Sequence, residues 1–336
     1  MFEHIAIVGA TGAVGREFLH LLGGRGLGDR RVTPLASGRS AGSVVEVAGR
    51  AVAVAELRED SFEGVDLAFF SAGSAVSRRF APAAVEAGAV VVDNSSAFRM
   101  EPHVPLVVPE INPHAARGHR GIVANPNCST IILAVAVWPL HRACRVRRMV
   151  VSTYQAASGA GAAAMAELQS QARDVLAGRT PHPRVLPFPI AFNLFCHDSP
   201  IDETGYNTEE VKMVDETRKI FGEPSLAITA TCVRVPVLRA HSESINLTFE
   251  RPVHADEARA VLEAAPGLRV VDSRDPQHFP MPIEASGVDP VLVGRIRQDL
   301  SRPDGCGLEL FVCGDQLRKG AALNAVQIAE WLERQA

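Results

Sequence analysis

The chain has 336 residues, of which 47% are hydrophobic and 21% are charged. This length favours two domains, and the composition is that of a globular protein. With 34 basic and 38 acidic residues, the formal net charge of −4 argues against nucleic-acid binding, which depends on clustered positive charge. The longest apolar run, residues 131–140, is about half of the ~20 residues that cross a membrane. Because the first residues also lack a secretory signal, we expect a cytoplasmic protein with no membrane partner.

The first 125 residues alternate short apolar strands with helices. The spacing of apolar residues predicts one helix after the first strand and another over residues 75–87. Strands are predicted over residues 4–9, 31–36, 65–71, 89–93 and 106–109. Short buried strands separated by helices are typical of a parallel sheet with helices on both faces. We therefore predict that residues 1–125 form a Rossmann-type, doubly wound α/β domain.

The pattern changes after the turn Asn125-Pro126-Asn127. Helices are predicted over residues 131–140, 161–177 and 208–221, and strands over 150–154, 228–238, 243–250 and 308–312. Residues 178–202 contain five prolines and are predicted to be irregular. Residues 126–314 should therefore form a separate α+β domain with a mixed or antiparallel sheet. Residues 315–336 contain a predicted helix over 318–334, which we expect to pack on the first domain.

A glycine-rich turn, GATGAVG, follows the first predicted strand at residues 9–15. Glycines at such a turn let the backbone approach a pyrophosphate at a helix N-terminus. The spacing is GxxGxxG rather than GxGxxG, so a tight turn without a ligand is the alternative to dinucleotide binding, which we favour. The second predicted strand ends near Arg39 and Ser40, without the acidic residue of an NAD site. A guanidinium beside hydroxyls suits a 2′-phosphate, which favours NADP over NAD; the alternative is an exposed loop arginine.

Cys128 has the most informative surroundings of the six cysteines, none of which forms a CxxC pair or a metal-ligand set. It precedes Ser129-Thr130 and the predicted apolar helix, and a helix N-terminus favours the nucleophilic thiolate. Asn127 can donate a hydrogen bond to an oxyanion beside it. From position alone, Cys128 is either a nucleophile or a buried structural thiol. His241 is a candidate acid–base partner because it lies near Arg234, which can bind a carboxylate; the alternative is a solvated loop histidine.

Seven motifs together resemble the aspartate-semialdehyde dehydrogenase family over almost the whole chain. They are GATGAVG at 9–15, DNSSAFR at 93–99, NPNCST at 125–130, YQAASGAG at 154–161, EEVKM at 209–213, RVPVLRAHSE at 234–243 and LRKGAALNAVQIAE at 317–330. The resemblance implies reductive dephosphorylation of L-aspartyl 4-phosphate by NADPH, which gives L-aspartate 4-semialdehyde and phosphate. This reaction leads to lysine through diaminopimelate, and to threonine and methionine. The resemblance also implies a homodimer whose second domain serves substrate binding and dimerisation.

The resemblance assigns a role to each matching position. Cys128 would form an acyl-thioester, His241 would be the general acid and base, and Gln155 would orient the substrate. The substrate would be bound by Arg234 at its α-carboxylate, by Glu209 at its ammonium group, and by Arg99 and Lys212 at its phosphate. The cofactor would contact Gly9, Thr11, Gly12, Ala13, Val14, Arg39, Ser40, Ser158, Gly159 and Gln316.

Two alternatives to this function differ in chemistry. N-acetyl-γ-glutamyl-phosphate reductase would use the same thiol, histidine and NADP, but its substrate has no ammonium group for Glu209 to pair with. A non-catalytic NADP-binding relative would keep Cys128 only as an unreactive thiol. Three positions depart from the family pattern, namely Ala240, where glycine is expected in many relatives, Gln316, where asparagine is common, and the additional charge of Arg239.

Overall fold

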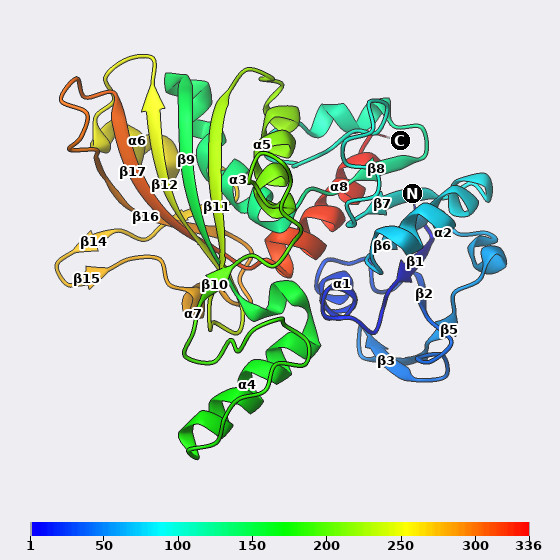
Figure 1. Cartoon of the computed structure of the whole chain (residues 1–336). Helices are drawn as coiled ribbons and strands as arrows, with labels where there is room; N and C mark the ends of the chain where they lie inside the picture. Colours follow the sequence, from blue (N-terminus) through cyan, green and yellow to red (C-terminus); the bar gives the residue numbers. More distant parts are fainter. Residues whose placement is uncertain (1, 336) are drawn as a thin grey trace. The chain divides into compact units, whose positions relative to one another are not determined.

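The structure is a computed structural model and describes residues 2–335 (Figure 1). The chain divides into two compact units. The first unit ends at Asn127 and resumes at Gly320, and the second is Cys128–Lys319. The divisions predicted from sequence fall after residues 125 and 314. The structure keeps residues 315–319 with the second unit, where Asp315 accepts a hydrogen bond from Arg239 and Gln316 accepts one from the Ala240 amide.

The first unit is built on a six-stranded parallel sheet in the order β5-β2-β1-β6-β7-β8. Its strands are β1 (His4–Val8), β2 (Arg31–Ala36), β5 (Ala55–Glu56), β6 (Leu67–Phe70), β7 (Val90–Asp93) and β8 (Ile122–Ala124). Helices α1 (Ala13–Gly24) and α8 (Leu323–Glu333) pack on one face, and α2 (Ser74–Glu86) packs on the other. Because both faces are covered, successive residues of β1 are all buried. The predicted doubly wound fold is confirmed.

Three segments of the first unit differ from the prediction. Residues 106–109 form no strand, because Pro105 and Pro109 interrupt the chain and only Leu106 bridges to Ala124. The strand next to β7, at this edge of the sheet, is β8, which was not predicted. A hairpin of β3 (Val44–Val47) and β4 (Arg50–Ala53) was not predicted. Two 3₁₀ turns, η1 (Glu59–Phe62) and η2 (Pro113–Gly118), complete this unit.

The second unit contains a seven-stranded mixed sheet in the order β10-β11-β9-β12-β17-β16-β13. Its strands are β9 (Val146–Gln155), β10 (Phe195–Cys196), β11 (Ala227–Arg234), β12 (His241–Phe249), β13 (Leu268–Val270), β16 (Val291–Gln298) and β17 (Gly307–Gly314). Figure 1 shows α3 (Cys128–Cys144), α5 (Thr208–Phe221) and α6 (Ala255–Glu263) on one side of this sheet. The remaining elements are α4 (Ala162–Leu176), α7 (Pro282–Ala285), η3 (Ala157–Ala160) and the hairpin of β14 (Ser273–Arg274) and β15 (Gln277–His278). The mixed sheet confirms the predicted α+β architecture.

Two elements in the second half of the chain have ends that differ from those predicted. The strand predicted over residues 228–238 ends at Arg234, because Pro236 has no N–H to donate and the Val237 and Leu238 carbonyls accept instead from Ala157 and Ser158. The helix predicted over 318–334 begins with a π-helical turn, η4 (Arg318–Ala322), before α8. No helix among residues 2–335 is both long and apolar enough to cross a membrane.

The strand registers bring polar residues together at one end of the mixed sheet. Strands β9 and β11 are parallel and end with Gln155 and Arg234, which are register partners. Strand β12 runs antiparallel to β9 and begins at His241, next to the Ser242–Tyr154 pair. Residues that are about 80 positions apart in the chain therefore become neighbours.

Candidate active site

His241 is completely buried at the start of β12. Its Nδ1 atom accepts a hydrogen bond from the Ala156 amide at 3.0 Å, so the neutral ring carries its proton on Nε2. Burial, and secondarily the Arg234 charge, lower the pKa of His241 to about 3. Nε2 has no hydrogen-bond partner among the described residues. The site therefore contains a neutral imidazole whose Nε2–H is available to a ligand.

Arg234 presents a buried guanidinium beside this imidazole. Nη1 donates to the Ala156 carbonyl at 3.1 Å, and Nη2 lies 3.0 Å from Nε2 of His197. Nε has no partner within residues 2–335, and burial lowers the pKa of the guanidinium. Asp198 lies 3.9 Å from Nη2, beyond hydrogen-bond distance. A guanidinium that keeps a free donor suits a carboxylate, which it binds in a bidentate manner.

Gln155 connects the end of β9 to helices α3 and α5. Its Nε2 atom lies 3.1 Å from Ser129 Oγ and 3.4 Å from Glu209 Oε1. The second oxygen of Glu209 accepts from Lys212 Nζ at 3.0 Å. Glu209 lies in the first turn of α5 and Lys212 in the second, and the N-cap residue of this helix forms a capping box. The Gln155 amide, the Glu209 carboxylate and the Lys212 ammonium group are thus linked by successive contacts near the Arg234–His241 pair.

Cys128 is the first residue of α3, a 17-residue helix. Its thiol is partly exposed and lies within electrostatic range of Arg234. The free N–H groups of the helix N-terminus and this guanidinium both favour an anionic sulfur. In contrast, burial raises the pKa of Cys144 and raises that of Cys313 to about 12. Cys128 therefore has the surroundings of a reactive thiol, whereas these two thiols remain protonated.

Ser158, Gly159 and Gln316 surround the loop that precedes His241. The Gln316 amide nitrogen donates to Ser158 Oγ, and its oxygen accepts from the Ala240 amide at 2.9 Å. Ala240 has a φ of +72°, a region that favours glycine and so accounts for the glycine expected there. Gln316, at a position where asparagine is common in the family, thus holds the backbone of the residue directly before His241.

The first unit has a cavity of about 450 Å³ at the carboxyl ends of β1, β2 and β6. Gly9, Thr11 and Gly12 line it together with Ser37 and Ser71. Gly9 has a φ of +90°, and a Cβ there would lie 2.5 Å from the Ser71 carbonyl oxygen. This close approach at the switch point of the sheet fits a dinucleotide. Of the other predicted cofactor residues, Ala13 and Val14 begin α1, Arg39 is exposed and Ser40 is partly buried in the turn after β2.

Arg99 is buried in the first unit beyond the end of β7. Its Nε atom donates to the Asn125 carbonyl and its Nη2 atom to the Asn94 carbonyl, both at 2.9 Å. The Asn125 side chain in turn bonds to Asn94 and to Asn324 of α8. Arg99 is therefore fixed by backbone carbonyls, while Asn127 is buried immediately before Cys128.

Comparison with known proteins shows the family of this chain. The model of the semialdehyde dehydrogenase NAD binding domain matches residues 4–119, and that of the semialdehyde dehydrogenase dimerisation domain matches residues 137–319. Aspartate-semialdehyde dehydrogenase from Synechocystis is 56% identical over 98% of this chain and 96% of the relative. The chain belongs to the aspartate-semialdehyde dehydrogenase family. A Legionella pneumophila member is 50% identical over 99% of this chain and 96% of the relative.

Solved structures of family members have the same fold. Aspartate semialdehyde dehydrogenase II from Vibrio cholerae, complexed with ASA, superposes with a TM-score of 0.95 at 42% identity and covers 99% of both chains. Members of this family are oxidoreductases with an NAD(P)-binding domain, which confirms the predicted enzyme class and cofactor. The match to the dimerisation domain agrees with the expected homodimer.

His197 and Ser129 contact the predicted family residues but were not predicted. Ser129 follows Cys128 directly, within the motif NPNCST. His197 lies in the proline-rich segment 178–202, whose composition gives no signal of function. Its contact with Arg234 brings it into the site.

Gly159 makes the site sensitive to a single added carbon. A Cβ there would lie 3.0 Å from Arg234 Nη1 and from His241 Cε1, and both side chains are buried. We expect Gly159→Ala to lower kcat/KM roughly tenfold to a hundredfold by displacing these groups. Steady-state kinetics check this effect against Gly118→Ala, where the added carbon meets nothing within 4 Å. Equal kinetics of the two variants would contradict the tight approach at Gly159.

Proposed function

We propose that the protein catalyses the reductive dephosphorylation of L-aspartyl 4-phosphate by NADPH to L-aspartate 4-semialdehyde and phosphate. The observation that carries the proposal is the convergence of Gln155, Arg234 and His241 at one sheet end, with the Cys128 thiol within electrostatic range of Arg234. This set provides a nucleophile, a proton donor and a carboxylate-binding cation. The product serves lysine, diaminopimelate, threonine and methionine biosynthesis, and since the relatives are biosynthetic enzymes, we infer that the reaction takes place in the cytoplasm.

The substrate is bound through its charges. Arg234 uses its free donor for the α-carboxylate, while Glu209 pairs with the ammonium group. Arg99 and Lys212 are the cations for the phosphate. The negative charge of Glu209 favours a free amino acid over an N-acetylated substrate, because only the free amino group is a cation that this acid attracts.

Acyl transfer begins with the Cys128 thiolate. Its sulfur attacks the acyl carbon, the bond from this carbon to the phosphate oxygen breaks, and phosphate leaves with the electron pair. Asn127 donates to the oxyanion of the tetrahedral intermediate. The product of this half-reaction is a thioester on Cys128.

Reduction of the thioester depends on His241. The Gly9–Gly12 turn, together with Ser158 and Gly159, would hold NADPH, which would supply a hydride. The neutral His241 ring donates its Nε2 proton to the oxygen that becomes negative, which leaves the ring as an imidazolate, and Gln155 orients the substrate. Taking the proton back lets the hemithioacetal collapse, which releases the aldehyde and restores the thiolate.

The proposed activity is tested in reverse, by following NADPH absorbance with aspartate 4-semialdehyde and NADP. We expect reduction that requires phosphate and is slower with NAD, because Arg39 and Ser40 suit a 2′-phosphate. N-acetylglutamate 5-semialdehyde serves as the alternative substrate and should not be oxidised. Turnover of that compound alone would identify the other reductase. A folded protein that binds NADP but oxidises neither aldehyde would indicate a non-catalytic relative.

Arg234→Lys should weaken substrate binding specifically. A lysine ammonium cannot bond Ala156 and His197 and still present two parallel donors to a carboxylate. We expect the KM for aspartate 4-semialdehyde to rise roughly tenfold to a hundredfold, with the KM for NADP unchanged. Arg179→Lys, in an exposed loop, is the matched control. An unchanged KM for the aldehyde would remove Arg234 from the substrate site.

A further inference from the structure

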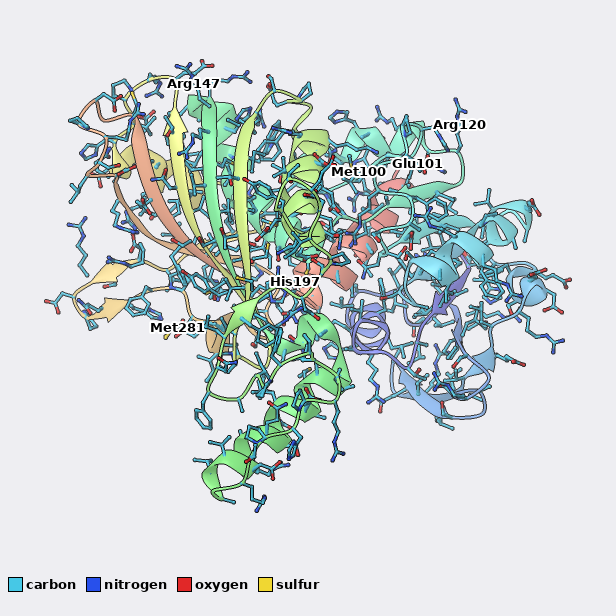
Figure 2. The ribbon with its side chains drawn as sticks, viewed as in Figure 1. Met100, Glu101, Arg120, Arg147, His197 and Met281 are labelled. Carbon is cyan, nitrogen blue, oxygen red and sulfur yellow. The ribbon has the colours of Figure 1, made fainter. Side chains whose placement is uncertain are left out.

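His197 lies at the edge of the mixed sheet, where the short strand β10 pairs with the end of β11 (Figure 2). The His197 amide donates to the Cys232 carbonyl at 2.8 Å, which fixes its backbone to β11. Its side chain is 14% exposed and reaches Arg234, with 3.0 Å between Nε2 and Nη2. This imidazole is therefore the side-chain hydrogen-bond partner of the proposed carboxylate-binding group.

The contact with Arg234 restricts the protonation of the His197 ring. A guanidinium only donates, so Nε2 of His197 must be the acceptor and must carry no proton. The neutral ring then has its proton on Nδ1, which lies 3.1 Å from Ser199 Oγ. The Ser199 amide, 3.2 Å from Nδ1, can bond only to the opposite tautomer, which would direct an imidazole N–H at the guanidinium.

Ser199 extends this contact to the start of α5. Its hydroxyl lies 3.3 Å from Oδ1 of Asn207, the N-cap residue of α5, and accepts from the Glu209 amide at 3.1 Å. A continuous path of hydrogen bonds thus joins Arg234, His197, Ser199 and the first turn of α5. The two ends of this path are the residues that we assign to the carboxylate and ammonium groups of the substrate.

We propose that His197 is a positioning residue for the amino-acid substrate, which holds the Arg234 guanidinium through Nε2 and sets its place relative to Glu209 through Nδ1–H and Ser199. This inference rests on the proposed function. Because the role requires an unprotonated Nε2, it ends when the ring becomes a cation and two positive groups face each other.

The charges around His197 act in opposing directions. Glu209 and Asp198 favour the imidazolium, whereas Arg234 and Lys212 disfavour it. Burial is the largest influence, and the pKa of His197 is lowered from its ordinary value. The ring is therefore neutral at neutral pH, and substrate binding should weaken only on the acid side.

Two substitutions separate the hydrogen bond from the bulk of the ring. His197→Ala removes the acceptor, and we expect the KM for aspartate 4-semialdehyde to rise about tenfold while kcat changes less than about threefold. His197→Gln supplies a neutral carbonyl oxygen and should restore the KM to within about twofold. The wild-type KM should rise on acidification more than the KM of His197→Gln, which has no ring to protonate. His182→Ala, at an exposed histidine of the same segment, is the control.

Nitrogen-15 NMR of the imidazole in the wild-type protein tests the same inference without activity. We expect the neutral ring of His197 to be protonated on Nδ1, with His197→Gln used to assign its signals. A proton on Nε2 would overturn the proposal, as would an unchanged KM in His197→Ala, or a KM in His197→Gln as high as in His197→Ala. If the wild-type enzyme oxidises no aspartate 4-semialdehyde, the proposed function fails, and the tautomer still decides the role of the His197–Arg234 contact.

Discussion

Replacing Cys128 by serine is expected to lower kcat by about 10⁴-fold or more. A serine hydroxyl at the N-terminus of α3 is a far weaker nucleophile than a thiol with the same surroundings. The fold and NADP binding should be unchanged, since the substitution alters one atom. Circular dichroism and an NADP titration establish both points before kinetics are compared.

The matched control for this variant is Cys306→Ser, at a partly exposed thiol directly before β17. It should retain wild-type turnover. Iodoacetamide near neutral pH should modify Cys128 first and abolish activity with one modified thiol per chain, because this thiol has a cation and a helix N-terminus beside it. Turnover by Cys128→Ser would refute the assignment of the nucleophile.

Replacing His241 by asparagine is expected to lower kcat by about 10²- to 10⁴-fold, the usual contribution of a positioned proton donor. Asparagine can keep the acceptor for the Ala156 amide but has no group at the position of Nε2. The substitution therefore removes proton donation while leaving the local backbone contact. The KM for NADP should change less than kcat, because the substitution leaves the glycine-rich turn that lines the cofactor cavity unaltered.

Pre-steady-state kinetics show which step His241 serves. Alkylation of Cys128 in His241→Asn should proceed at close to the wild-type rate, because the thiolate is stabilised by the helix terminus and by Arg234. Hydride transfer should become the slow step, with a deuterium isotope effect on 4R-labelled or 4S-labelled NADPH that exceeds that of the wild type. A variant with slow alkylation and unaltered hydride transfer would instead make His241 the base that activates the thiol.

The sequence predicts the first unit well because its strands are short, apolar and buried on both faces. The failures have local causes. Residues 106–109 have strand composition, but Pro105 and Pro109 prevent a ladder, and β8, with three residues, is too short for periodicity to reveal. In the second unit, no strand was predicted at β16 (Val291–Gln298), because Gly294 and a register shift obscure the alternating pattern.

The site residues came from motifs, and their spatial relation came from the strand registers. No spacing in the chain places Gln155 beside Arg234, because this pairing depends on the register of β9 and β11. His197 lies outside the motifs that we matched, in a segment whose prolines predict only irregular structure. Its contact with Arg234 required the three-dimensional structure. The assigned roles of the site residues remain predictions for the variants described above.

A single-turnover experiment without phosphate tests the central claim most directly. Enzyme mixed with excess NADP and aspartate 4-semialdehyde should release one equivalent of NADPH per active site and then stop, because the thioester on Cys128 has no acceptor. Rapid acid quenching and peptide mass spectrometry should locate an aspartyl group on Cys128, and phosphate should restore steady turnover. Continuous NADPH formation without phosphate, or a full burst with no label on Cys128, would contradict acyl transfer through this thiol.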